Sequence, residues 1–108
     1  MATGRLNGVD ITTTGATSVY TCPVTTFSVV SVSICNRTAS AVTVNLALTA
    51  TGATPATTDY LEFGASLSAN GVVERTGIVM SAGNQLVVTA GTGNALSVIV
   101  VGIETATA

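Results

Sequence analysis

Two runs of alternating apolar and polar residues lie in the middle of the chain, within residues 27–48. Apolar side chains occupy every other position from residue 30 to residue 34, and again from residue 42 to residue 48. A period of two places them on one face of a strand, whereas a helix would space them three or four residues apart. The short polar link at residues 36–40 predicts that the two strands pair as an antiparallel hairpin.

Short apolar runs bounded by Gly, Pro and Asn continue on both sides of this stretch. We expect further strands at residues 18–21, 59–63, 72–80, 85–89 and 96–103. Asn70-Gly71 predicts a tight turn, and Gly77 predicts a bulge or a close backbone approach. The loop at residues 49–58 is expected to cross between two sheets. The pattern predicts an all-β fold, a single-domain antiparallel β-sandwich of jelly-roll or immunoglobulin-like type with about seven to eight strands. A small closed barrel is the alternative.

The length of 108 residues fits one domain. We divide it into an extended N-terminal arm at residues 1–14, ordered by lying on a neighbour, and a sandwich at residues 15–108. The N-terminus lacks the apolar block of a signal peptide, and the longest apolar run is far shorter than a membrane span. We therefore expect synthesis in a cytoplasm and no membrane partner.

Charge is scarce, because only 7% of the residues are charged against about 25% in typical domains. Three arginines with no lysine argue against a nucleic-acid partner. Without histidine or lysine, general acid-base catalysis and zinc binding have few residues to use, so we expect neither an enzyme nor a cofactor or metal. A surface built from threonine, valine and alanine predicts coverage by further copies or by a partner protein, and a monomer with threonine-rich faces is the alternative.

Two cysteines, Cys22 and Cys35, raise the question of a disulfide. Synthesis in a cytoplasm favours two free thiols that behave as small apolar residues. A bond across two sheets stays open.

The candidate contact residues are the few charges and the spare apolar positions. In the last strand Val98 and Val100 alternate with Ile99, Val101 and Ile103, so both faces are apolar. The strand is either central and covered twice or has an interface on one face. We expect the charges to set the register between subunits. The predicted interface residues are Arg5, Leu6, Val9, Arg37, Glu74, Arg75, Ile99 and Val101.

Several sequence blocks also resemble a known group of proteins. They are Val19-Tyr20-Thr21-Cys22-Pro23, Ile34-Cys35-Asn36-Arg37 with Ala41-Val42-Thr43-Val44, Asp59-Tyr60-Leu61-Glu62, Asn70-Gly71-Val72-Val73-Glu74-Arg75-Thr76-Gly77 and Val101-Gly102-Ile103-Glu104. From about residue 17 onward the chain is similar to small virion structural proteins of tailed phages, particularly cyanophages. The tail at residues 105–108 is less acidic than this resemblance implies.

The resemblance implies a non-enzymatic role in the virion, assembled in the cytoplasm of a bacterial host. Our leading expectation is a capsid decoration, or cement, protein that forms a homo-oligomer, a trimer, and binds the phage major capsid protein. A tail, baseplate or fibre-associated subunit is one alternative. A carbohydrate-binding adhesion module is another, and it would need Tyr20, Tyr60 or Phe63 exposed in a groove.

Overall fold

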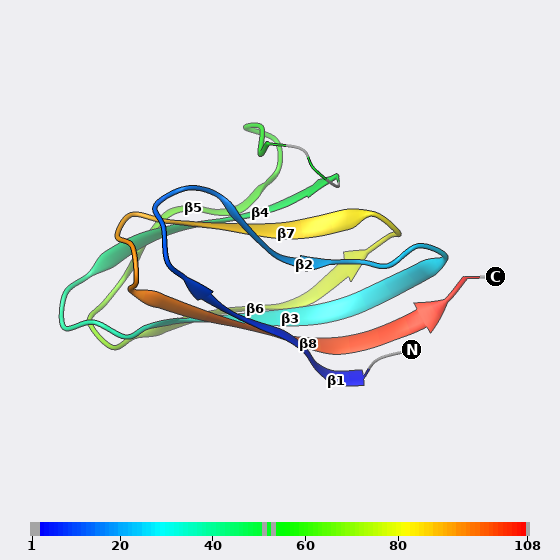
Figure 1. The fold of residues 1–108 in the computed structure, drawn as a ribbon, viewed down its shortest axis with the longest axis horizontal. Helices are drawn as coiled ribbons and strands as arrows, with labels where there is room; N and C mark the ends of the chain where they lie inside the picture. The colour runs from blue at the N-terminus through cyan, green and yellow to red at the C-terminus, as the bar shows by residue number, and fades with distance from the viewer. Residues whose placement is uncertain (1–2, 51, 53, 108) are drawn as a thin grey trace.

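The computed structural model describes residues 3–50, 52 and 54–107, and within them every regular element is a strand. The strands form two four-stranded antiparallel sheets, which we call sheet A, in the order β1-β8-β3-β6, and sheet B, in the order β2-β7-β4-β5 (Figure 1). Their bounds are β1 Thr3–Ile11, β2 Thr17–Thr21, β3 Thr26–Asn36, β4 Val42–Ala50, β5 Tyr60–Leu67, β6 Val72–Met80, β7 Asn84–Ala90 and β8 Leu96–Ala106. The expected all-β sandwich is confirmed.

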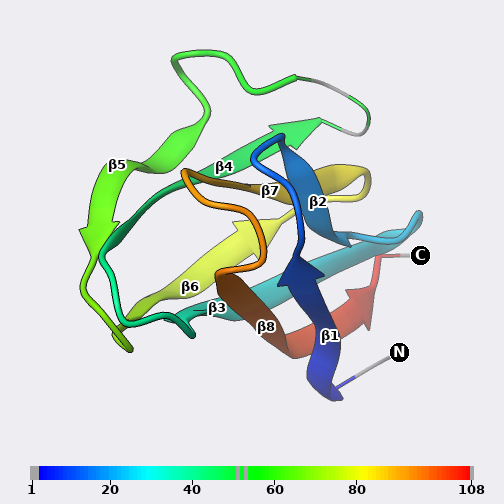
Figure 2. The same ribbon diagram turned by 60° about the vertical axis from the view of Figure 1, so that its left-hand side comes forward.

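The strand pairs are nested along the chain. β1 pairs with β8, β2 with β7, β3 with β6 and β4 with β5, as in one long hairpin whose tip is the β4–β5 connection. The pairs β3–β8 and β4–β7 then join the folded hairpin into two stacked sheets (Figure 2). Two sheets in these strand orders have jelly-roll topology, so the immunoglobulin-like alternative is excluded.

The core lies between the sheets and consists of one side of each strand. Sheet A contributes residues such as Val32, Ile34 and Val98, and sheet B contributes residues such as Leu46 and Leu86, all at most 1% exposed. Each such side chain stabilises the fold by about 1.5–3 kcal/mol relative to exposure, which lets a domain of this size fold without a disulfide.

The predicted hairpin at residues 27–48 is wrong, because β3 belongs to sheet A and β4 to sheet B. The link crosses from one sheet to the other as an arch organised by Asn36, which is fully buried. Its Nδ2 donates hydrogen bonds to the carbonyl oxygens of Ser40, Leu67 and Ser68 at 2.8–3.2 Å, and its Oδ1 accepts from Thr38. The alternation of apolar and polar residues correctly predicted which face of β3 and of β4 is buried. The two strands lie in opposite sheets, however, so their apolar faces meet across the core.

The loop at residues 49–58, expected to cross between sheets, does not do so. It connects β4 and β5, which are antiparallel neighbours in sheet B; Thr51 and Ala53 lie outside the described residues. The crossing falls on shorter links such as residues 68–71 between β5 and β6. There Asn70 has the positive φ, 56°, that a tight turn needs, although the turn joins two sheets.

The expected N-terminal arm is also placed differently. Residues 3–11 are β1, an edge strand that pairs with β8 of the same chain from Thr3 opposite Ile103 to Ile11 opposite Leu96. Leu6 and Val9 pack against the chain's own core, because the free edge of β8 offers hydrogen-bonding groups within reach. Met1 and Ala2 lie outside the described residues.

The predicted bulge at Gly77 is confirmed. The pairing of β6 with β3 shifts between Val30 and Val32, and Gly77 has a φ of 69°. The shift brings Val79 and Glu74 to the same side of the sheet, and that side is the one described next.

Candidate functional site

β8 is apolar on both faces, but the protein covers only one of them. Leu96, Val98 and Val100 point into the core and are at most 1% exposed. On the other face Ile99, Val101 and Ile103 are 43%, 40% and 49% exposed, although β8 is a central strand. Among the described residues, the chain therefore covers only the inner face of β8 fully.

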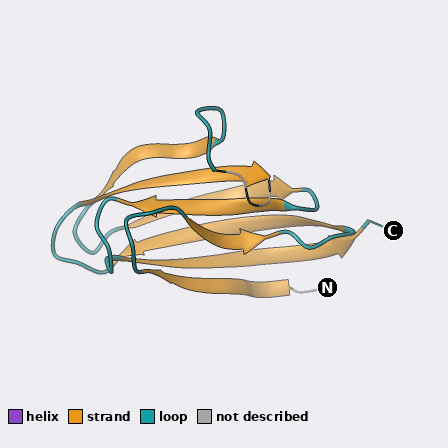
Figure 3. Ribbon diagram, turned by 45° about the horizontal axis from the view of Figure 1, so that its top comes forward, coloured by secondary structure: helices purple, strands orange, loops and turns teal. Residues whose placement is uncertain are grey.

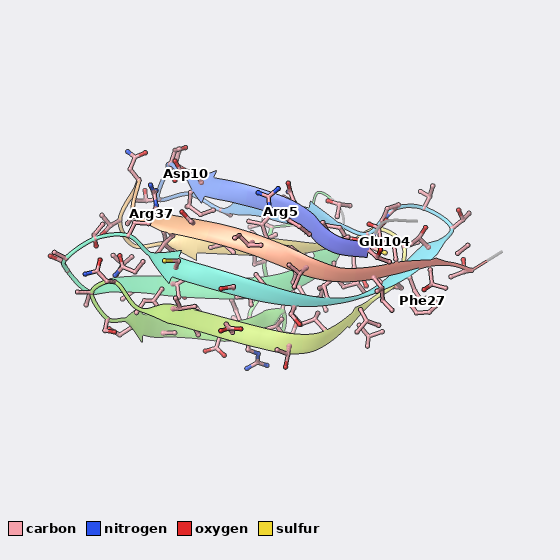
Figure 4. The ribbon with its side chains drawn as sticks, turned by 90° about the horizontal axis from the view of Figure 1, so that it is seen from below. Arg5, Asp10, Phe27, Arg37 and Glu104 are labelled. Atoms are coloured by element: carbon pink, nitrogen blue, oxygen red, sulfur yellow. The ribbon has the colours of Figure 1, made fainter. Side chains whose placement is uncertain are left out.

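Neighbouring strands extend this outer surface, which we call the sheet A face (Figure 4). The side chains of two residues paired across antiparallel strands point to the same side of the sheet. The residues of this face are therefore those paired, directly or through β3, with the outward residues of β8. Its members are Thr3, Arg5, Gly8, Asp10, Phe27, Val29, Ser31, Ser33, Cys35, Val72, Glu74, Val79, Ser97, Ile99, Val101, Ile103 and Thr105.

Large apolar side chains lie along β8 on this face, and small side chains lie beside them. β8 presents the large side chains Ile99 and Val101, while β3 presents Ser33 and Ser31 directly opposite them. A ridge on β8 thus runs beside a shallow furrow on β3.

Two of the three arginines are neutralised inside the chain. Arg37 at the β3–β4 arch pairs with Asp10 at the end of β1, at 2.5 Å, and also donates to the carbonyl oxygen of Asn94. Arg75 on β6 pairs with Glu62 on β5 at 2.8 Å and so links the edge strands of the two sheets. These pairs serve the fold of one chain.

Arg5 and Glu74 are different, because among the described residues neither takes part in an ion pair within the chain. Both are exposed on the sheet A face, on the opposite edge strands β1 and β6. The guanidinium of Arg5 lies over Gly8, since a Cβ on Gly8 would collide with its Nη2. Gly8 and Glu74 share one row across the sheet, three strand spacings or about 14 Å apart.

Tyr20 is not part of an exposed groove. It is 8% exposed, and its hydroxyl donates a 2.6 Å hydrogen bond to Glu104, which joins β2 of sheet B to β8 of sheet A. Burial, and next the hydrogen bond to Glu104, raises the pKa of Tyr20 to about 12. This contact holds the two sheets together at one end of the sandwich.

A second surface feature lies on β5 and the loop before it. The rings of Tyr60 and Phe63 meet edge to face with centroids 4.8 Å apart, and Phe63 is 73% exposed. With Thr57 they line a shallow pocket of about 180 Å³, which we call the aromatic pocket. That volume is smaller than the roughly 300–1,000 Å³ of typical small-molecule sites, and none of the three lining residues is an Asp, Glu, His or Lys.

Both cysteines are free, as expected. Cys22 is buried, and its thiol donates to the carbonyl oxygen of Thr26 at 3.4 Å. Cys35 is half-buried on the sheet A face.

No group of three or more His, Cys, Asp or Glu side chains that could hold a metal ion occurs in the described part of the chain. Within that same part, no helix is long and apolar enough to span a membrane.

The structure thus brings together four of the eight predicted interface residues, Arg5, Glu74, Ile99 and Val101, on one face. Leu6 and Val9 lie against the core, and Arg37 and Arg75 are paired within the chain. Four other apolar positions on this face, Phe27, Val29, Val72 and Val79, were not predicted from the sequence, and Ile103 was assigned to the outer face of the last strand but not to the interface. The alternation in residues 27–35 carried a signal for two of them, since Phe27 and Val29 occupy outward positions that polar residues usually fill.

Comparisons of the chain with protein-family models, with curated proteins and with solved structures find no match.

Proposed function

We propose that this protein is a non-enzymatic structural subunit that works by packing the sheet A face against other protein surfaces. The observation that carries the proposal is the open apolar face of β8, where Ile99, Val101 and Ile103 stay 40–49% exposed on a central strand. Contiguous apolar surface of this kind marks interaction sites in soluble proteins. A chain with only 7% charged residues has few charges to keep such a face apart from its neighbours.

Within that class we propose a phage capsid decoration protein that self-associates and binds the major capsid protein. The sequence blocks similar to small virion proteins support this assignment. The jelly roll is compatible with this assignment, because viral capsid domains share the topology. Lectins and cupins share it too, so the fold supports the assignment by analogy alone. A tail, baseplate or fibre-associated subunit is the variant of the proposal that differs in location.

The test is quantitative mass spectrometry of particles purified from the host that carries the gene. A decoration protein gives a copy number comparable with that of the major shell protein, whereas a tail subunit is present in far fewer copies. Absence of the protein from purified particles would overturn the proposal.

A binding experiment tests the role of the face itself. Purified protein added to particles that lack it should bind, and Val101→Glu, which weakens self-association through this face, should bind less well. Ser66→Glu, an exposed position on β5 of sheet B, is the matched control and should bind like the wild type. Equal binding by all three proteins would remove the sheet A face from the proposed function.

The aromatic pocket favours one alternative function, carbohydrate binding during adhesion. Sugars stack on exposed aromatic rings, and Phe63 is exposed beside Tyr60. A glycan array that shows binding by the wild type and loss of binding by Phe63→Ala would establish this function. An array without any bound glycan would dismiss it.

A further inference from the structure

We propose that the sheet A face pairs with the same face of a second copy, about a two-fold axis that runs along the strands between β8 and β3. Arg5 of each copy then meets Glu74 of the other. This inference names the partner for the self-association in the proposed function and rests on that part alone, so it holds or fails whether or not the protein belongs to a virion.

The strand order determines what such an axis brings together. Sheet A reads β1-β8-β3-β6, so a two-fold axis between its central strands places β1 of one copy over β6 of the other. It likewise places β8 over β3. Because the axis runs along the strands, residues in one row of the first copy face the same row of the second.

The charges select this axis over the alternatives. The guanidinium of Arg5 and the carboxylate of Glu74 lie in the same row on opposite edges, so the axis along the strands superposes them twice, once in each direction. An axis across the strands would place β1 over β1 and leave Arg5 without an acid opposite. Complementary charges at the rim of an apolar interface fix its register in this way.

The sizes of the side chains on the face fit the same two-fold axis. Ile99 and Val101 on β8 face Ser33 and Ser31 on β3 of the second copy, so the ridge of one sheet lies in the furrow of the other. Packed sheets lie about 10 Å apart with strands within about 30° of each other, a gap that an arginine and a glutamate can bridge together at the edge.

The size of the face sets the expected strength. Four strands about 4.8 Å apart and about 30 Å long present roughly 600 Å² on each copy, or about 1,200 Å² in the pair. That total is at the lower end of the range for stable interfaces, so we expect a dimer that dissociates on dilution in roughly the micromolar range.

A two-fold contact uses the same patch on both copies and closes at two. The trimer expected from the sequence would need two different patches on each copy.

The experiment uses charge reversal and mixing. In Arg5→Glu each contact places two acids together, and in Glu74→Arg it places two arginines together, so each variant alone should dimerise at least about tenfold more weakly than the wild type. Mixed in equal amounts, the two variants restore both opposite-charge contacts and should form a heterodimer, and the double variant should dimerise like the wild type. Sedimentation velocity and native mass spectrometry measure these species.

Rescue has no explanation within one chain, because Arg5 and Glu74 are too far apart to interact there. Circular dichroism and thermal melting should show that both single variants stay folded, since both side chains are exposed. Ser66→Glu and Ser66→Arg place the same charges on sheet B, and their mixture should show no preference for a heterodimer.

The inference is overturned if the wild type stays monomeric or forms a trimer, if the single variants associate like the wild type, or if mixing gives no heterodimer. A different result would show that the proposed function is wrong while this inference holds. A protein that dimerises as described but is absent from purified particles keeps the inference and loses the virion role.

Discussion

The outer faces of the two sheets differ, although both sheets fill the same core. On sheet A the outward positions of β8 are Ile99, Val101 and Ile103, each 40–49% exposed. On sheet B the corresponding pairs are Asn45 with Thr89, Ala47 with Val87 and Thr49 with Gln85. Ala47 and Val87 lie outside the core cluster yet are only 1% and 3% exposed. The β4–β5 connection rises on that side of the sandwich (Figure 3).

The two sheets differ in how much apolar surface their central strands leave exposed to solvent. Along its central strands β4 and β7, sheet B presents hydroxyls and amides and buries Ala47 and Val87, whereas Phe63 on its edge strand β5 stays exposed. Sheet A leaves valine and isoleucine half-exposed and carries Arg5 and Glu74, neither of which takes part in an ion pair among the described residues. Sheet A is therefore the face on which we propose that a second copy packs.

The largest effect is expected from a charge placed on the buried face of β8, compared with the same charge on its exposed face. Val100→Asp places a charge in the core, at a position that is 0% exposed, and should unfold the protein, since an unpaired buried charge costs an amount comparable with the whole stability of about 5–15 kcal/mol. Val101→Asp, one residue further, should keep the fold and lose self-association. Circular dichroism and sedimentation report the two results, and a folded Val100→Asp variant would contradict the assignment of the faces.

Next in size is the arch that joins the sheets. Asn36→Ala removes several hydrogen bonds of a fully buried amide and should lower the free energy of unfolding by about 2–3 kcal/mol in urea denaturation. Asn45→Ala is the matched control, because Asn45 is half-buried and accepts one hydrogen bond, from Gly64, so it should cost about 1 kcal/mol. Equal losses would mean that Asn36 does not organise the arch.

This arch also shows how far the sequence could predict the fold. Alternation correctly indicated strands, the sandwich and the strand at residues 72–80, because side-chain period is a local property. It failed for residues 27–48, since β3 pairs with β6 and β8, whose sequence positions are remote. Pairing between distant strands, and with it the jelly-roll topology, is not encoded in any short window.

The candidate site was predictable to a similar degree. Arg5, Glu74, Ile99 and Val101 were identified one by one, as rare charges or as spare apolar positions. Only the register across β1, β8, β3 and β6 shows that they share a face. The same register assigns Arg75 to the opposite side, where it pairs with Glu62.

A smaller effect should come from the tyrosine that joins the sheets at their other end. Tyr20→Phe loses the hydrogen bond to Glu104 and should cost about 1–2 kcal/mol at neutral pH.

The same contact predicts a pH dependence. The pKa of Tyr20 rises from 10.0 to about 12 in the folded protein, so between these pH values only the unfolded chain releases the proton. The free energy of unfolding of the wild type should then fall by up to about 1.4 kcal/mol per pH unit from this group, and the contribution is complete below pH 10. Urea denaturation at pH 9 to 12 measures it, and a wild type that parallels Tyr20→Phe would refute the coupling.

The smallest effect should come from the ion pair that links the sheet edges. Arg75 and Glu62 are 43% and 25% exposed at their side chains, so Arg75→Ala should change stability by less than about 1 kcal/mol. It should also leave self-association unchanged, in contrast to Arg5→Glu on the sheet A face. Loss of association in Arg75→Ala would mean that the contact surface extends beyond that face.

The most direct measurement of the central claim is the reaction rate of Cys35 with a small thiol reagent as the protein concentration is raised. Cys35 lies on the sheet A face, and buried Cys22 serves as an internal control within the same chain. If this face is a contact between copies, labelling of Cys35 should slow as the dimer forms, and Arg5→Glu should move the slowing to at least about tenfold higher protein concentration. A rate that stays constant from dilute to concentrated protein would show that the face remains open and would contradict the account.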